Sequence, residues 1–414
     1  MHDRHLKQMF WGAGMVFVLI GVWGWYVRLT QGHLDTDYGS LIPWGLWVAS
    51  YIYFIGLSAG SFLISALVYV FGVKRFEAIG RTALFTALVT LMLALLAIWA
   101  DLGHMGRSWH VLAYPNFKSP MAWMIWLYGA YFLLLAVELW FLTRRDLVNG
   151  GRGSGWKARV YRVLALGSQE DSDASEAHDR RVVRVLATIG VPVAIMFHGG
   201  VGALFGVVAA RPAWNSGLFP ILFLLSALAS GGALLVLVTA VFQEGWHRNK
   251  DTVLSLGRLV LGLLLLDVLF QVSEYLIAGY GNVPGHVAGL KLIFTGPYWW
   301  VFWGWQLLLG TAIPIVLLAA RRTRNDPRFV SLAGLLIAVG FIGLRLNIVI
   351  PALASEEVTG LAEAIASPRL STEYFPSLSE WALTVGIVGL GLLLFGLGEK
   401  LLPQQKEEPV DVRP

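Results

Sequence analysis

Cysteine is absent from all 414 residues of the chain, and histidine is almost absent from its apolar stretches. Without thiolates the chain cannot hold an iron–sulfur cluster in the usual way. A buried b-type haem usually takes two helix histidines, and of the nine histidines only His198 lies deep in an apolar stretch. If the chain handles electrons, they must pass through a bound organic carrier, and a partner must supply the metal centres.

Charged residues are also scarce, at 14% of the chain, against about 25% in soluble domains. Hydrophobic residues make up 57%, and the mean hydropathy is +0.65. Crossing a bilayer as a helix takes about 20 apolar residues. We therefore expect an all-α integral membrane protein with ten transmembrane helices, at 9–29, 43–72, 79–101, 120–143, 185–209, 218–243, 253–280, 297–320, 329–350 and 379–402.

The basic residues are sorted to one side of these spans. If the N-terminus is cytoplasmic, 24 of the 31 Lys and Arg residues fall in inner segments and seven in outer segments. Because positive charge gathers on the cytoplasmic side, we expect a multi-pass protein of the bacterial inner membrane with both termini in the cytoplasm. The net charge of +5 gives no reason to expect nucleic acid as a partner. The longest inner loop, 144–184, is interpreted as a solvated linker, with a docking segment as the alternative.

A weak repeat relates the two halves of the chain at a shift of 177 residues. The shift spans four helices, so the two copies have the same orientation in the membrane. The sequence predicts two parallel-repeat four-helix bundles, spans 2–5 and 6–9, flanked by spans 1 and 10, although chance matching in a Leu- and Trp-rich sequence is the alternative. The shift aligns Gly80-Arg81 with Gly257-Arg258, Pro120 with Pro297, Trp123 and Trp126 with Trp300 and Trp303, and Arg144-Arg145 with Arg321-Arg322.

The predicted division is therefore into an N-terminal helix and outer loop (1–42), a first bundle (43–209), a second bundle (210–350) and a last part holding an outer loop, the final helix and a cytoplasmic tail (351–414). Spans 2 and 6 share stripes of small residues, GLSAGSFL and LASGGALL. Such stripes permit close approach of helices.

Ionisable groups at the outer end of span 3 form the first candidate site. The run ADLGHMGRSWHVL contains Asp101, His104, Arg107 and Trp109. An Asp and a His three residues apart at a helix end can share a hydrogen bond, and with Arg107 they could hold a hydroxyquinone oxygen and take its proton. Helix capping with a surface salt bridge is the alternative.

Asp267, Gln271 and Glu274 form the second candidate site, since their spacing places all three on one face of span 7. Ionisable groups inside a span cost about 2.5–3.5 kcal/mol each on insertion scales and normally face a protein interior or a wet cavity. The three residues are interpreted as a proton relay or an ion site, with simple interhelical hydrogen bonding as the alternative.

Three further residues join this candidate proton path. His198 lies near mid-membrane on span 5 beside two glycines, although a lone His is more often a satisfied interior residue. Glu138, near the inner end of span 4, is interpreted as an inner proton entrance or as a partner of the basic pair at 144–145. Arg345, toward the outer end of span 9, could balance Glu274 across the bundle. No nucleotide loop, catalytic triad or metal site is evident, so we assign no catalytic residue and no metal ligand.

Five stretches together resemble the NrfD/PsrC-like polysulfide reductase membrane subunits, in the longer, ten-span branch of that family. The resemblance covers nearly the whole chain, and the order of the motifs is more specific than any one of them. They read IPWGLWVASYIYFIGLSAGSF (42–62), IWADLGHMGRSWHVLAYPNFKSPMAW (98–123), FTGPYWWVFWGWQLLLGTAIPIVLL (294–318), RLNIVIPA (345–352) and YFPSLSEW (374–381).

The resemblance implies a membrane anchor that binds quinone or quinol, menaquinone or ubiquinone, near the outer face, without haem or an iron–sulfur cluster of its own. It implies a ferredoxin-like iron–sulfur partner on the outer face, often with a molybdopterin or multihaem cytochrome c protein beyond it, and in some members proton translocation. The implied quinone residues are Trp44, Tyr51, Asp101, His104, Arg107 and Trp109. Some relatives carry a His where this chain has ASYIYF, so Tyr51 is the nearest protonatable group here.

Two other hypotheses stay open at this point. A secondary transporter or ion-coupled carrier with a parallel repeat would show broken helices near the midplane, and Pro192 and Pro314 lie inside spans. A purely structural anchor would bind no quinone. The sequence does not reveal whether the chain is quinone-reactive or non-catalytic. It also does not reveal which quinone the chain takes or in which direction electrons flow.

Overall fold

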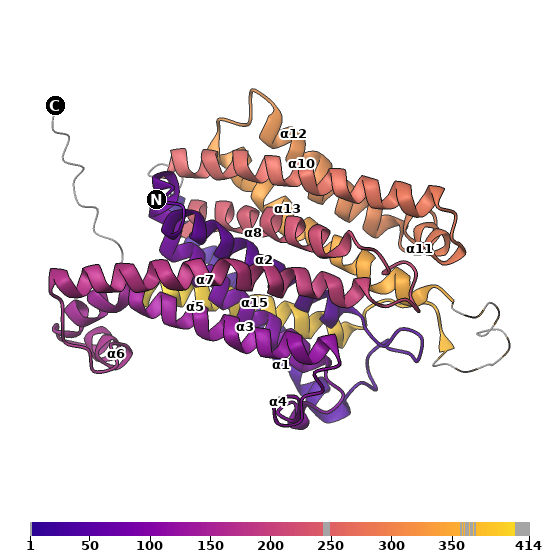
Figure 1. Ribbon diagram of the computed structural model, residues 1–414, viewed down its shortest axis with the longest axis horizontal. Coiled ribbons are helices and arrows are strands. Elements are labelled where there is room, and N and C mark those ends of the chain that lie inside the picture. Colours follow the sequence, from indigo (N-terminus) through magenta and orange to yellow (C-terminus); the bar gives the residue numbers. More distant parts are fainter. Residues whose placement is uncertain are drawn as a thin grey trace.

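The computed structural model describes residues 2–242, 249–356 and 370–401, together with residues 358, 360, 364 and 367. Within these residues every regular element is a helix, and ten helical stretches are long and apolar enough to cross a membrane. They run side by side along the long axis of the molecule (Figure 1). The predicted all-α fold with ten spans is confirmed. The predicted cytoplasmic tail after the last span lies outside the described residues.

The spans match the predicted positions closely, because a continuous apolar stretch in lipid must satisfy its backbone hydrogen bonds as a helix. They are α1 (His2–Gln31), α2 (Leu46–Tyr69), α3 (Gly80–Asp101), α5 (Pro120–Gly151), α7 (Asp173–Gly206), α8 (Phe219–Phe242), α10 (Lys250–Tyr280), η3 with α12 (Val301–Ala312 and Ile313–Ala319), α13 (Pro327–Ala354) and α15 (Leu378–Leu401).

Short helices lie in the connections. They are η1 (Lys74–Ile79), η2 (Met105–Arg107), α4 (His110–Ala113), α6 (Trp156–Leu164) and α11 (Pro284–Phe294). The end of the molecule that carries η2, α4 and α11 is called the outer end below, following the charge pattern of the sequence. The opposite end, which carries η1 and α6, is called the inner end.

The inner ends of α5 and α7 extend well beyond the predicted spans. The two helices have 32 and 34 residues, about 48–51 Å at 1.5 Å per residue, and they are joined through α6. The loop 144–184 is therefore mostly helical, which differs from the expected solvated linker. A buried ion pair between Arg144 and Asp179, with 2.8 Å between Nη2 and Oδ2, ties the two extensions together.

Replacing Arg144 by Met is expected to destabilise this inner end by about 3–5 kcal/mol, because it leaves the Asp179 charge buried and unpaired. The side chains of Arg144 and Asp179 are only 7% and 8% exposed. Thermal unfolding of the purified protein measures the effect. Arg180→Met is the matched control, since its pair with Glu176 is 78% exposed on the arginine side and is worth less than about 1 kcal/mol. Equal losses in both variants would contradict the prediction.

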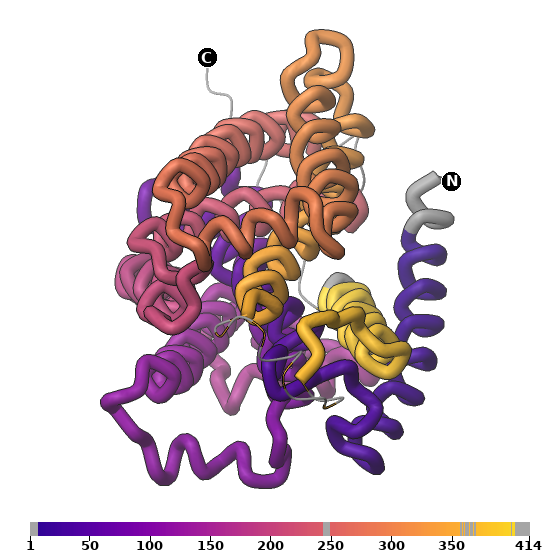
Figure 2. Tube along the Cα trace, turned by 90° about the vertical axis from the view of Figure 1, so that its right-hand side faces the viewer, coloured from indigo at the N-terminus to yellow at the C-terminus, as the bar shows by residue number. Residues whose placement is uncertain are grey.

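α1 and α15 lie side by side on one flank of the molecule (Figure 2), and we describe the other spans in the two predicted groups of four. In the first group α2 contacts α3 and α7, and α5 contacts the same two helices. In the second group α8 contacts α10 and α13. The span formed by η3 and α12 contacts α13 along both parts and α10 through α12. α1 pairs with α15, and α15 also packs on α3. The neighbour pattern is the same in both groups, while the repeat itself stays a prediction. One apolar core runs through both groups.

The two groups meet where the small-residue stripes of α2 and α8 cross. A Cβ on Gly231 would lie 2.6 Å from the Ser61 nitrogen and 2.7 Å from the Gly60 Cα. Backbones approach this closely only where side chains are missing. The predicted close approach of spans 2 and 6 is therefore confirmed, and it sets the distance between the bundles.

The first twelve residues of the eighth span, η3, form a π-helix. Pro314 lies just beyond η3 and has no N–H to donate to the carbonyl four residues earlier, which favours wider turns. Gly310 of η3 packs directly on Gly340 of α13, where a Cβ on Gly310 would lie 2.9 Å from the Gly340 Cα. The helix path continues into α12 without an unwound segment, and α7 runs through Pro192.

Candidate functional site

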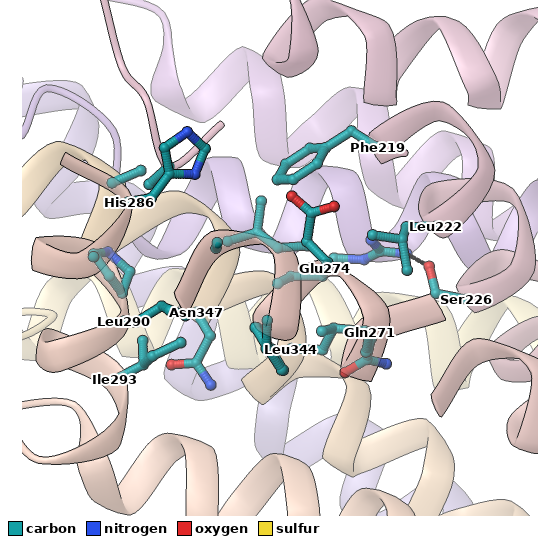
Figure 3. Close-up of a pocket in the computed structure, with 18 of the residues that line it drawn as sticks. Phe219, Leu222, Ser226, Gln271, Glu274, His286, Leu290, Ile293, Leu344 and Asn347 are labelled. Atoms are coloured by element: carbon teal, nitrogen blue, oxygen red, sulfur yellow. Dashed lines mark hydrogen bonds between the residues drawn. The ribbon is translucent and has the colours of Figure 1, made fainter. Parts of the chain in front are cut away.

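A cavity of about 90 Å³ lies between α8, α10, α11 and α13, toward the outer end of the molecule (Figure 3). Asp267, Gln271 and Glu274 line it from α10, and Arg345 lines it from α13. Four of the six residues predicted for a proton path thus surround one cavity. A cavity of this volume has room for several water molecules, and the polar side chains that line part of its wall offer them hydrogen-bond partners.

A chain of side-chain amides holds the Asp267 carboxyl group. Gln271 Nε2 donates to Asp267 Oδ2 at 2.5 Å, Gln306 Nε2 donates to Gln271 Oε1 at 2.8 Å, and Asn347 Nδ2 donates to Gln306 Oε1 at 2.7 Å. These hydrogen-bonded amides join α10, η3 and α13. Asp267 Oδ1 is buried and has no hydrogen-bond partner among the described residues, so one carboxyl oxygen is fixed and the other is available to a proton or a water molecule.

Arg345 is only 1% exposed and lies at the centre of the molecule. Its Nη2 donates to Ser226 Oγ at 2.5 Å, and its Cζ lies 4.7 Å from the centre of the Phe223 ring. Arg345 and Asp267 interact electrostatically. A buried charge is costly unless it is paired, and Asp267 is the carboxylate that acts electrostatically on Arg345, without a direct hydrogen bond between the two side chains. Glu274, which the sequence analysis placed opposite Arg345, instead accepts a hydrogen bond from Ser216 Oγ at 2.8 Å.

His198 of α7 lies next to Arg345, against the same glycine of α2. A Cβ on Gly56 of α2 would lie 3.3 Å from Arg345 Nη2 and 3.5 Å from His198 Cε1. The glycine therefore lets both side chains meet at one point of α2. His198 is fully buried, with its ring 6.0 Å from that of Phe223. Together with Asp267 and Arg345 it forms a polar centre, to which His198 is the contribution of the first bundle.

Glu138 is separate from this centre. It lies on α5, fully buried, and neither carboxyl oxygen has a hydrogen-bond partner among the described residues. The alternative that Glu138 pairs with the basic residues at 144–145 is not what the structure contains, because Arg144 binds Asp179 and Arg145 binds Asp173. The inner half of the candidate path thus contains an isolated acid.

A second cavity, of about 440 Å³, opens at the outer end between η3, α13 and residues 371–381. Five of its fourteen lining residues are aromatic, and Trp300 and Trp381 belong to them. Asn347 lines both cavities. The amide chain that ends at Asn347 therefore connects the wall of the outer cavity with Asp267.

The six residues predicted for quinone binding lie in four places. Trp44 stacks on Trp214, with ring centres 5.8 Å apart, and Tyr51 faces α5. Asp101 lies at the end of α3. The remaining three residues are exposed on the outer connection that follows, because the chain becomes extended at Leu102 and leaves the helix face of Asp101. These exposed residues are His104, Arg107 and Trp109.

Asp101 takes part in a network that joins α3 to the flanking pair. Tyr38 Oη donates to Asp101 Oδ1 at 2.8 Å, where the sequence analysis expected a bond with His104. Arg28 of α1 donates to the carbonyls of Ala100 and Leu102 at 2.6 and 2.5 Å. Burial, together with the neighbouring Asp101 carboxylate, raises the pKa of Tyr38 well above its usual value, so the phenol stays a donor.

Several polar residues of the site were missed in the sequence. Tyr128 Oη donates to Tyr51 Oη across the first bundle, and Glu380 of α15 accepts from Tyr374 Oη at 2.5 Å and from the Asp37 nitrogen at 3.1 Å. Gln306 carried a usable signal, as a lone amide inside an apolar span. Glu380 carried none, since an acid in the first turn of a helix is ordinary.

Comparison with known proteins gives consistent matches over most of the chain. A family model described as polysulphide reductase, NrfD, matches residues 35–355. A selenate reductase subunit of Mesobacillus selenatarsenatis is 38% identical over 412 residues, which is 97% of this chain and 96% of that protein. The putative dimethyl sulfoxide reductase membrane subunit of Halobacterium salinarum is 29% identical, covering 96% of this chain and 92% of that protein. The Hdr-like menaquinol oxidoreductase integral membrane subunit of Archaeoglobus fulgidus is 28% identical, covering 89% and 87%.

Proposed function

The chain belongs to the polysulphide reductase NrfD family, and we propose on that premise that it is the quinone-reactive membrane subunit of a respiratory oxidoreductase complex. It binds a quinone or quinol near the outer face and exchanges electrons with an iron–sulfur partner docked there. The observation that carries the proposal is the similarity over nearly full length to subunits named for selenate reductase and menaquinol oxidoreductase complexes. Since the chain has no cysteine, thiolate-held clusters belong to the partner.

We assign the quinone head group to residues of the first bundle on the chemistry of their side chains. The Tyr51 hydroxyl accepts a hydrogen bond from Tyr128 and so keeps its own proton for a third partner, such as a quinone oxygen. Trp44 lies seven residues earlier, just before the same helix begins, and offers an aromatic face. Asp101 and His104 lie at the outer end of the neighbouring α3, where a proton can leave to water. A bound quinone supplies two-electron chemistry, and these side chains hold and deliver its protons.

The second bundle supports a proton path that ends at the polar centre. Glu274 lies toward the outer part of the cavity and Asp267 at its base, beside Arg345 and His198. Side-chain amides do not carry protons at neutral pH, so Gln271 orients Asp267 rather than relaying. Glu138 provides an acid on the inner side. In this proposal, quinol chemistry at the outer face is coupled to proton movement through Asp267.

Tyr51→Phe, Asp101→Asn and His104→Ala test the quinone site. Each is expected to weaken binding of a fluorescent hydroxyquinoline-N-oxide quinol analogue about tenfold and to slow quinol oxidation by about tenfold to a hundredfold. Asp101→Asn keeps an acceptor for Tyr38, so the outer network survives. Tyr26→Phe is the control, because Tyr26 is 63% exposed on α1. Unchanged binding and turnover in all three variants would exclude this site.

The alternative of an ion-coupled carrier finds no support in the described spans, which run without an unwound segment at mid-membrane. Purification discriminates between the two functions. Copurification of an iron–sulfur protein is the result we expect. A lone chain that drives solute uptake into vesicles would overturn the proposal.

A further inference from the structure

The connection between α5 and α7 at the inner end forms a helical hairpin with α6 folded back along α5. Tyr161 packs over Gly150, and the Trp140 indole Nε1 donates to the carbonyl of Leu164 at 2.9 Å. α6 therefore begins near the end of α5 and runs back toward the membrane. Figure 1 shows α6 beside the inner ends of α5 and α7.

The end of α6 reaches the depth of the hydrocarbon boundary. Trp140 lies 20 residues after Pro120, where α5 begins, which is about 30 Å along the helix and equals the thickness of the hydrocarbon core. Since Leu164 bonds to Trp140, the C-terminal end of α6 lies at the inner interface rather than out in the cytoplasm.

The tip of the hairpin is apolar and uncovered. Val163, Leu164 and Leu166 are 68%, 45% and 76% exposed. Leu166 also has a φ of 50°, a conformation that Gly or Asn adopts far more readily than Leu. In water, no burial of the exposed leucine side chain would offset the free-energy cost of this backbone conformation. At the membrane interface the same side chain is buried among acyl chains.

Positive charge surrounds this tip. Lys157, Arg159 and Arg162 are exposed on α6. Four of the acidic residues nearby are engaged by other arginines, while Glu170 is exposed: Asp179 is bound by Arg144, Asp173 and Glu176 by Arg145, and Asp171 by Arg152. The hydrogen bond from Arg152 holds the pKa of Asp171 below its usual range. The three cations of α6 are therefore left for a partner of opposite charge.

We propose that the hairpin is an interfacial anchor for anionic phospholipid: the tip at Val163, Leu164 and Leu166 enters the inner leaflet, and Lys157, Arg159 and Arg162 bind lipid phosphates. Apolar side chains beside cations on a short helix are the features of such anchors. Each Lys or Arg near an anionic surface contributes about 1 kcal/mol, or about fivefold in affinity. The inference is independent of the proposed redox function.

The absence of native cysteine makes depth measurable in the full-length chain. Leu166→Cys and, separately, Asn325→Cys are labelled with a nitroxide and reconstituted in phosphatidylcholine–phosphatidylglycerol vesicles. Asn325 is the matched control, because it is exposed in the inner turn between α12 and α13. Power saturation then compares collisions with oxygen, which concentrates in lipid, and with a water-soluble nickel chelate. We expect the label at 166 to be at least about threefold better protected from nickel, with high oxygen contact.

Two outcomes would overturn the proposal. Equal nickel contact at 166 and 325 would place the tip in water, and protection from both nickel and oxygen would place it against protein.

A second experiment tests the role of the cations. It uses the triple variant Lys157→Gln/Arg159→Gln/Arg162→Gln, with Arg321→Gln/Arg322→Gln/Arg324→Gln as a charge-matched control. Phosphatidylglycerol retained per protein, measured by mass spectrometry, should fall about fivefold or more in the first triple variant only. Equal retention in the two triple variants would remove the anionic lipid from the inference.

Discussion

The Asp267→Asn variant is expected to lose quinol-coupled proton uptake by at least about a hundredfold, the usual scale for removing a positioned proton carrier. Asn keeps the shape of the side chain and still accepts the hydrogen bond from Gln271, but it cannot take a proton at Oδ1. The same variant removes the carboxylate that acts electrostatically on the buried Arg345, so we also expect a loss of stability, smaller than the about 3–5 kcal/mol for breaking a buried ion pair.

A double variant separates these two effects. In Asp267→Asn/Arg345→Gln both charges are removed, so no buried charge is left without an opposite charge near it. The melting temperature should therefore return toward that of the wild type, while proton uptake should not. Reconstituted complex with an internal pH dye measures uptake, and thermal unfolding measures stability.

Asp251→Asn is the matched control for these variants. Asp251 lies in the first turn of the same helix, exposed at the inner end, so its loss should alter neither reading by more than about twofold. If the double variant took up protons at the wild-type rate, the polar centre would be a structural element only.

The Gly231→Leu variant is expected to remove most of the folded protein from the membrane. A Cβ there would already lie 2.6 Å from the Ser61 nitrogen, and a backbone atom cannot move aside as a side chain can. Separating α2 from α8 also separates the two bundles, since this crossing sets their distance. We expect a cost above about 3 kcal/mol, at the upper end for overpacked sites.

Gly262→Leu provides the comparison on a neighbouring span. A Cβ on Gly262 of α10 would meet nothing within 4 Å, so a leucine there extends into free space. Membrane levels of each variant, followed by fluorescence-detected size exclusion, report how much folded protein is present. Similar levels of the two variants would show that the α2–α8 crossing tolerates side chains.

The spans could be predicted from the sequence because lipid forces each apolar stretch into a helix. The extensions of α5 and α7 could not, because hydropathy treats Arg144 and Asp179 as loop residues. Only their pairing across 35 positions makes them part of two long helices. Hydropathy also carries no information on α1 packing against α15, which depends on contacts between the two ends of the chain.

The alignment of Asp267, Gln271 and Glu274 on one face of α10 could be predicted, because it depends only on spacing within one helix. The first-bundle candidates depended on where α3 ends and on partners far away in the chain. Tyr38 lies 63 positions from Asp101, and Glu380 still further, so no local pattern signals their contact. The sequence could not reveal the orientation of Gln306 either, because it follows from the wide turns of η3.

The wide turns of η3 bear on the predicted repeat, because the matching span of the first half, α5, is an α-helix throughout. At the offset of 177 residues Gln306 corresponds to Gly129, where a Cβ would meet nothing within 4 Å, whereas Gln306 is 5% exposed. The same offset pairs Asp267, Gln271 and Glu274 with Thr90, Ala94 and Ala97. If the predicted repeat is a duplication, its two copies share an outline but divide the labour, because only the second copy carries this ionisable face.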